Sequence, residues 1–231
     1  LPQIEKVVAT TDNAKSLKRA MENVDCLMIT ASNLFTDHRE NNLNLIRCAR
    51  KAQVKELLFI STVNTGRSES LPARENQETE RIVRQSGIPY LILRVNLLME
   101  QLPLFIGDTI QTHTLYFPAG TGKVSFISAS DVARAVQTLH IRHFYTHTIY
   151  TLSHSISHSF ADIADMLTLI SGTFIRYEHL ENEVFRTAMT RLQLPEAITE
   201  RLCHIASAIE NNEYDVPDTT LHRLIKEGAE D

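Results

Sequence analysis

The clearest pattern in the chain is a change from polar to apolar residues between positions 77 and 95, QETERIVRQSGIPYLILRV. The first part is highly charged with one apolar edge, as in a helix at a protein surface. Gly87 then suits the left-handed end of a helix, and Pro89 prevents the helix from resuming. Residues 88–95 are almost wholly apolar over the length of a strand, which indicates a strand covered on both faces. A helix that leads into such a strand is half of a βαβ unit and favours a parallel α/β fold.

Upstream of this stretch, strand-like and helix-like patterns alternate in the same way. Residues 14–24 and 41–52 have the apolar spacing of amphipathic helices. Four segments have the apolar content and length of strands: residues 4–9, 24–30, 54–62 and 88–95. Because a helix-length segment joins each consecutive pair, we expect these four strands to lie parallel in one doubly wound sheet.

Downstream, the pattern is mixed at first. Three elements are predicted there: a strand at residues 124–127, a helix capped by Ser130, and a strand at residues 148–152. Ser159 then begins a capping box ahead of an apolar helix that ends at Gly172.

The last part of the chain is mainly helical in pattern. Residues 181–228 have helical spacing that Pro195 and Pro217 interrupt. A chain of 231 residues is long enough to bury a full core. We therefore predict a sheet domain over residues 1–153 and a small, mainly helical substrate or partner lobe over residues 154–231.

Residues 79–94 contain the motif T-E-x-x-x-x-x-S-G-I-P-Y-x-I-L-R, which joins a helix end, a turn and a strand at fixed spacing. The motif resembles the signature of the NmrA-like family of atypical short-chain dehydrogenases/reductases, and residues 118–139 resemble a second block that recurs there. The resemblance implies a Rossmann-like doubly wound sheet that binds NAD(P)H. It implies a reductase acting on a quinone-like or other small carbonyl acceptor or, as the alternative, a non-catalytic NAD(P)-sensing regulatory protein.

The first glycine of the chain is Gly66. A dinucleotide fold needs glycines in its first strand-to-helix turn, because only they let the backbone approach the pyrophosphate. We therefore interpret the sequence as beginning at the family's third strand, without the glycine-rich first βα unit. NAD(P)H is then expected to bind only to the intact protein with its upstream segment. A third interpretation is an inactive fragment that cannot bind the cofactor.

Candidate binding residues lie near the carboxyl ends of the predicted strands, where ligands of such sheets bind. The resemblance implies a cofactor-binding set: Thr30, Ala31, Ser32, Ser61, Thr62, Asn76, Val95, Asn96 and Leu97. It implies a substrate-binding set in the loop that follows: Met99, Leu102 and Phe105. The alternative for the second set is ordinary core, and the sequence leaves both possibilities open.

No catalytic residue is assigned, because the expected proton donors are missing. No tyrosine is followed by lysine four residues later, which excludes the mechanism of ordinary short-chain dehydrogenases. The NmrA-like family often has His or Lys where this chain has Asn76. An amide holds no titratable proton near neutral pH, so acid catalysis from this position would be weak.

Composition narrows the choice of partners. The net charge of −5 and the pI near 6.1 leave no basic field for nucleic acid or anionic lipid. No apolar run reaches the roughly 18 residues of a membrane span. Three cysteines without metal-ligand spacing indicate reduced thiols and a cytoplasmic protein. We expect a small-molecule substrate, and either a protein partner or a second copy at an unpaired sheet edge.

A group of histidines raises the question of a metal site. Its members are His140, His143, His147, His154 and His158. They fall in a presumed loop, at a strand edge and in a serine-rich turn, so solvated or packed histidines are the better interpretation. No metal site is predicted.

Overall fold

A computed structural model describes residues 5–30, 37–141 and 147–225. Its centre is a parallel sheet of four strands in the order β1-β2-β3-β6. These strands are β1 (Cys26–Ile29), β2 (Glu56–Thr62), β3 (Tyr90–Val95) and β6 (Thr148–Leu152). The fold is a Rossmann-like α/β fold, as predicted. Four predicted strands are confirmed: residues 24–30, 54–62, 88–95 and 148–152.

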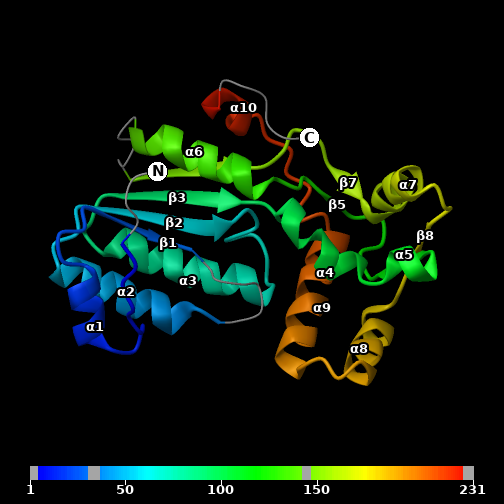
Figure 1. Cartoon of the computed structure of the whole chain (residues 1–231), viewed down its shortest axis with the longest axis horizontal. Coiled ribbons are helices and arrows are strands. Elements are labelled where there is room, and N and C mark those ends of the chain that lie inside the picture. Colours follow the sequence, from blue (N-terminus) through cyan, green and yellow to red (C-terminus); the bar gives the residue numbers. More distant parts are fainter. Residues whose placement is uncertain (1–4, 31–36, 142–146, 226–231) are drawn as a thin grey trace.

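Helices cover both faces of this sheet (Figure 1). One face is covered by α1 (Ala14–Ala20), α2 (Arg39–Lys51) and α3 (Leu71–Gln85). The other face is covered by α6 (Ala129–Ile141) and α10 (Thr220–Leu224). Successive residues of β2 alternate between two apolar cores. Leu57 belongs to the core with α1, α2 and α3, and Leu58 to the core with α6 and α10. Both side chains are buried, which explains the uninterrupted apolar sequence of this strand.

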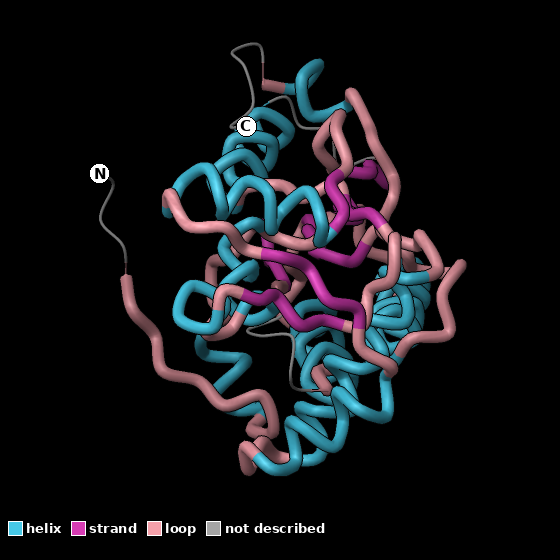
Figure 2. Tube along the Cα trace, turned by 90° about the vertical axis from the view of Figure 1, so that its right-hand side faces the viewer, coloured by secondary structure: helices cyan, strands magenta, loops and turns pink. Residues whose placement is uncertain are grey.

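The strand predicted at residues 4–9 is wrong over its described part. Residues 5–9 have no strand geometry and run as a loop along the outside of the molecule (Figure 2). Val8 is 94% exposed, so it packs against nothing that would hold an extended segment in place. In the common doubly wound order 3-2-1-4-5-6, two other strands separate the third strand from the fourth. A segment in the third position therefore has no neighbour among the described strands of this chain.

A second region packs around its own apolar core beyond the carboxyl ends of the strands (Figure 1). Its helices are η1 (Met99–Gln101), α4 (Leu102–Ile106), α5 (Thr109–Thr112), α7 (Phe160–Ser171), α8 (Asn182–Arg191) and α9 (Glu196–Glu210). Its strands are β4 (Thr114–Phe117), β5 (Lys123–Val124), β7 (His158–Ser159) and β8 (Arg176–His179). β4 pairs with β8 in parallel, and β5 pairs with β7 in antiparallel orientation. The predicted strand at 124–127 is thus shorter and earlier, and the predicted boundary between residues 153 and 154 stays a prediction.

Helix starts in this part of the chain depend on serine caps. The predicted capping box is confirmed, because Ser159 Oγ accepts from the Asp162 backbone N–H at 3.2 Å while Asp162 Oδ2 accepts from the Ser159 N–H at 2.7 Å. The cap predicted at Ser130 is wrong. α6 already begins at Ala129, and Ser128 Oγ accepts from the Asp131 N–H at 3.0 Å. Both serines offer the same cap chemistry, and the earlier one lies where the chain turns into the helix.

Candidate functional site

The acidic and basic residues of the sequence motif form a buried ion pair. Glu80 on α3 is 1% exposed, and its carboxylate accepts from Arg94 Nε at 2.9 Å and from a terminal Arg94 nitrogen at 2.8 Å. Arg84 adds a third contact at 2.7 Å. Ser61 Oγ donates to the same carboxylate at 2.7 Å. The motif therefore joins α3, β2 and β3 through one carboxylate.

The electrostatics of Glu80 agree with that structural role. Burial raises the pKa of its carboxyl group, but hydrogen bonds from Arg94 and Ser61 outweigh burial and hold the pKa below its ordinary value. The carboxylate is therefore charged near neutral pH and paired on several sides. Such a group stabilises the fold and is poorly suited to donate a proton to a substrate.

A second polar network lies at the carboxyl end of β2. Thr62 Oγ1 donates to Asn64 Oδ1 at 3.1 Å, and both side chains lie near enough to the hydroxyl of Tyr214 to lower its pKa. Tyr214 is fully buried, which raises its pKa to about 12 and keeps the phenol neutral. Asn64 is also buried, and its Nδ2 has no hydrogen-bond partner among the residues that the structure describes. A buried donor without a partner is costly, so this network is incomplete as it stands.

The carboxyl ends of β3 and β6 are closed by Asn96. Its Nδ2 donates to Ser153 Oγ at 2.7 Å and to the Tyr214 carbonyl oxygen at 3.0 Å. Its Oδ1 accepts from the Leu97 backbone N–H at 2.8 Å. Asn96 is 4% exposed, and both ends of its amide are engaged within the protein.

The remaining predicted cofactor residues differ in their surroundings. Thr30 is exposed just after β1, and Val95 is buried in β3. Ala31 and Ser32 lie outside the described residues. Asn76 is half-buried on α3, where its Nδ2 donates to the Pro72 carbonyl oxygen of its own helix at 2.8 Å. The structure thus gathers Thr30, Ser61, Thr62 and Asn96 at one edge of the sheet, and their assignment to a cofactor stays a prediction.

The predicted substrate residues lie in and on the apolar core of the second region. Phe105 is 3% exposed, with its ring 5.4 Å from that of Phe117 and 6.3 Å from that of Phe160. Met99 and Leu102 are half-buried against the same core. This packing matches what the core alternative expects, while a role as the wall of a substrate pocket stays a prediction.

Sequence reasoning gave no role to several residues that organise this edge. Glu80 and Arg94 belong to the sequence motif of residues 79–94, and their opposite charges could have indicated an ion pair. Asn64 and Tyr214 had no such signal, because Tyr214 comes from beyond α9, 150 residues after Asn64 in numbering. Only the fold brings these two side chains together.

Groups suited to a metal ion lie at the opposite, amino-terminal edge of the sheet. Cys26 and Glu56 are the first residues of β1 and β2, and His140 lies in the last turn of α6.

Among the described helices, each is too short or too polar to cross a membrane.

The sequence model of the NmrA-like family matches residues 3–227, nearly the whole length of this chain. The chain belongs to the NmrA-like family. It is 25% identical to quinone oxidoreductase 2 of Escherichia coli over 81% of this chain and 65% of that protein. It is 26% identical to the NAD(P)H azoreductase of Xenophilus azovorans over 81% of this chain and 66% of that protein. The chain thus spans just under two thirds of the length of these two curated relatives.

Solved structures show the same fold. The crystal structure of an NADPH-dependent quinone oxidoreductase from Escherichia coli, complexed with NADPH, superposes with a TM-score of 0.91. The match covers 97% of this chain and 80% of that one at 23% sequence identity. This likeness confirms the Rossmann-like fold of this NmrA-like chain.

Proposed function

We propose that the protein carrying this chain is an NAD(P)H-dependent reductase of a quinone-like or other small carbonyl acceptor. The family supports the cofactor class, and the relatives named as quinone and azo reductases support the acceptor class. The observation that carries the proposal is the unpartnered Nδ2 of buried Asn64 at the carboxyl end of β2. Ligands of open parallel sheets bind at that end, and a polar group there would complete the network.

The residues present fit one side of a dinucleotide. Exposed Thr30 and half-buried Thr62 offer hydroxyl groups after β1 and β2, next to the Asn64 donor. Asn96 and Leu97 close the neighbouring part of the edge. We assign the ribose and nicotinamide side to Thr30 and Thr62. The pyrophosphate would need a glycine-rich segment in addition to these 231 residues.

Reduction of a quinone by a reduced nicotinamide needs little acid catalysis from the protein. A reduced nicotinamide supplies a hydride, and a quinone that accepts it takes up one proton to become a hydroquinone. The chain's task is to hold donor and acceptor in line and to exclude water from the apolar side. Among the described candidate residues, Asn76 can donate a hydrogen bond to a carbonyl oxygen, but the proton must come from water.

A non-catalytic NAD(P) sensor is the second candidate. Asn76 favours it, because this amide is already bonded to Pro72 in its own helix and cannot transfer a proton. For either candidate we propose a cytoplasmic protein. For the 231 residues taken alone, association with a partner or a second copy would use β1, which lies at the edge of the described sheet.

The test is turnover of NADPH with simple quinones by the intact protein, followed by the loss of NADPH absorbance. We expect slow turnover that Asn76→His or Asn76→Lys raises by a factor of order 10², because a titratable donor is restored. Asn44→His, on α2, is the control for adding a histidine elsewhere. NADPH binding without turnover in every variant would favour the sensor. Absence of both binding and turnover would reject the reductase.

A further inference from the structure

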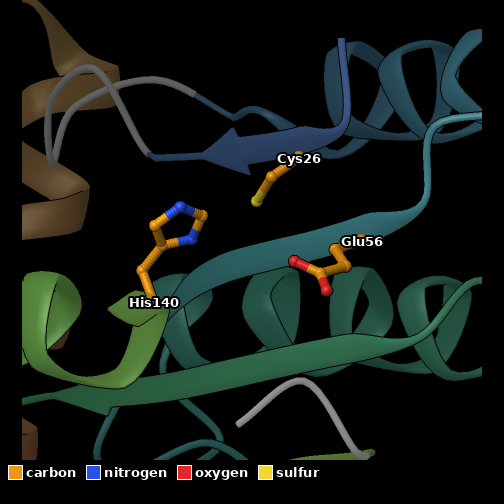
Figure 3. A group of neighbouring side chains, drawn as sticks. All are labelled: Cys26, Glu56 and His140. Atoms are coloured by element: carbon orange, nitrogen blue, oxygen red, sulfur yellow. The ribbon is translucent and has the colours of Figure 1, made fainter. Parts of the chain in front are cut away.

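Three side chains with metal-binding groups converge at the amino-terminal edge of the sheet (Figure 3). They are Cys26 from β1, Glu56 from β2 and His140 from α6, and their ligand atoms all lie within 4.8 Å of one another. Figure 3 shows the three side chains directed into one space between the two strands and the helix. They are far apart in sequence, so only the fold assembles them.

The two strand residues are held in place by the sheet itself. Cys26 is the direct partner of Glu56 in the parallel pairing of β1 with β2. Residues opposite each other in a ladder present their side chains on the same face, a few ångströms apart. The face is the one covered by α6, because Leu58 follows Glu56 by two residues and packs in the core that contains Leu139. The thiol and the carboxylate therefore need little ordering to act together.

The third side chain is positioned by the packing of α6. Val132, Ala135 and Leu139 fix this helix on the sheet, and His140 follows directly after Leu139. Cys26 and Glu56 are half-buried, whereas His140 is exposed. The cluster is thus rigid on the side of the strands and open on the side of the helix, so an ion can enter from solvent.

We propose that Cys26, Glu56 and His140 form a binding site for Zn²⁺ or a similar borderline-soft divalent cation. Thiolate, imidazole and carboxylate are the three ligand types of protein zinc sites, and sulfur disfavours Mg²⁺ and Ca²⁺. A thiolate and a carboxylate together balance the two charges of the ion. Three protein ligands leave the fourth position of a tetrahedral site for water or another ligand.

The geometry needs only a small closure. With metal–ligand bonds of about 2.0–2.3 Å, donor atoms in a tetrahedral site lie roughly 3.4–3.6 Å apart. The present upper limit of 4.8 Å therefore requires a movement on the order of 1 Å. The exposed imidazole can supply it by a change of rotamer while the two strands stay fixed. The bound ion would tie the edge strand β1 to β2 and α6, whether or not the protein reduces quinones.

The experiment measures binding of Zn²⁺ by competition with a chromophoric chelator, and binding of Co²⁺ by its absorption spectrum. We expect one ion per chain and a thiolate-to-cobalt charge-transfer band. Loss of a partner outside the ligand set already weakens metal binding about 10–100-fold, so Cys26→Ser, Glu56→Gln and His140→Gln should each weaken it at least tenfold. Cys26→Ser should also abolish the charge-transfer band.

Matched substitutions outside the cluster separate this site from adventitious binding. Cys48→Ser, Glu22→Gln and His158→Gln each remove the same ligand type elsewhere, and we expect less than a twofold change. A hundredfold excess of Zn²⁺ over its Kd should raise the Tm by roughly 5–10 °C, and only when the cluster is intact. The proposal is overturned if Zn²⁺ binds no better than to the Cys26→Ser protein, or if the control variants lose as much affinity as the cluster variants.

Discussion

The carboxyl edge of the sheet has two regions that differ in how their polar groups are satisfied. In the closed region, at β3 and β6, the amide of Asn96 is engaged at both ends, and Arg94 of β3 is paired with Glu80 of α3. In the open region, at β1 and β2, Thr30 is exposed and the Asn64 Nδ2 has no partner among the described residues. Polar residues of a family motif can therefore serve the fold, and unsatisfied donors are the better guide to a ligand.

The largest effect is expected for Glu80→Gln in the closed region. Removing one partner of a buried ion pair costs about 3–5 kcal/mol, and we expect the lower end because Arg94 and Arg84 keep some exposure. Urea unfolding measures this loss in the free energy of unfolding. Glu78→Gln is the control, because Glu78 pairs with Arg39 at an exposed site worth about 0–1 kcal/mol. Equal losses for the two variants would contradict the structural role of Glu80.

The same variant has a defined pH signature. The folded-state pKa of Glu80 lies below its ordinary value of 4.5, so its contribution is complete above about that pH. It is lost as the pH falls through the lowered pKa, because the protonated carboxyl no longer pairs with Arg94. The difference in stability between wild type and Glu80→Gln should therefore shrink in acid. A difference that stays constant down to acid unfolding would contradict the assignment.

Asn96→Ala is expected to have the next largest effect, again on stability. The substitution leaves the buried Leu97 N–H without its acceptor, at about 1–3 kcal/mol, and removes the donor to Ser153 Oγ, which keeps its own bond to the Ser125 carbonyl oxygen. Because Asn96 is closed off from solvent, the Kd for NADPH of the intact protein should change less than twofold. A tenfold weaker Kd with unchanged stability would show that Asn96 contacts the cofactor instead.

Thr30→Val should show the reverse pattern in the open region. An exposed substitution without packing changes stability by less than about 0.5 kcal/mol. Loss of one hydrogen bond to a cofactor hydroxyl would raise the Kd for NADPH by roughly three- to tenfold. Thr187→Val, at an exposed position on α8, is the control for the same chemical change. If Thr30→Val binds NADPH as tightly as this control, the open region is not the cofactor side.

The fold was largely predictable because its central strands are buried on both faces. Such strands leave continuous apolar runs, as at β2 and β3, and the edge strand β1 carries an apolar run although Met28 is 47% exposed. Residues 5–9 carry a similar local signal but lack a neighbouring strand among the described residues, and pairing is what makes a strand. The same limit applies to Ser130, where local chemistry fitted a cap, but the helix begins at Ala129 and Ser128, two residues earlier, caps it.

The candidate site was less predictable, because its geometry depends on contacts that sequence spacing does not report. Ser61 on β2 was expected to face a ligand, yet its hydroxyl donates to the carboxylate of Glu80 on α3. Asn96 was expected to reach a cofactor, yet it is bonded to Ser153, which lies 57 residues further along the chain. The grouping of Cys26, Glu56 and His140 could not be predicted from the sequence, because the three side chains come from separate elements. Of the five histidines grouped in the sequence, only His140 belongs to it.

The most direct test of the cofactor claim is a titration with NADPH, followed by cofactor fluorescence. A pyrophosphate without two or three hydrogen bonds from a glycine-rich turn loses about 3–9 kcal/mol of binding free energy. A site of micromolar Kd, near −8 kcal/mol, would then fall to the millimolar range or vanish. We therefore predict no saturation at low micromolar NADPH for the 231-residue chain alone, and saturation there once a glycine-rich βα unit precedes it. Low-micromolar binding by the 231 residues alone would contradict the account.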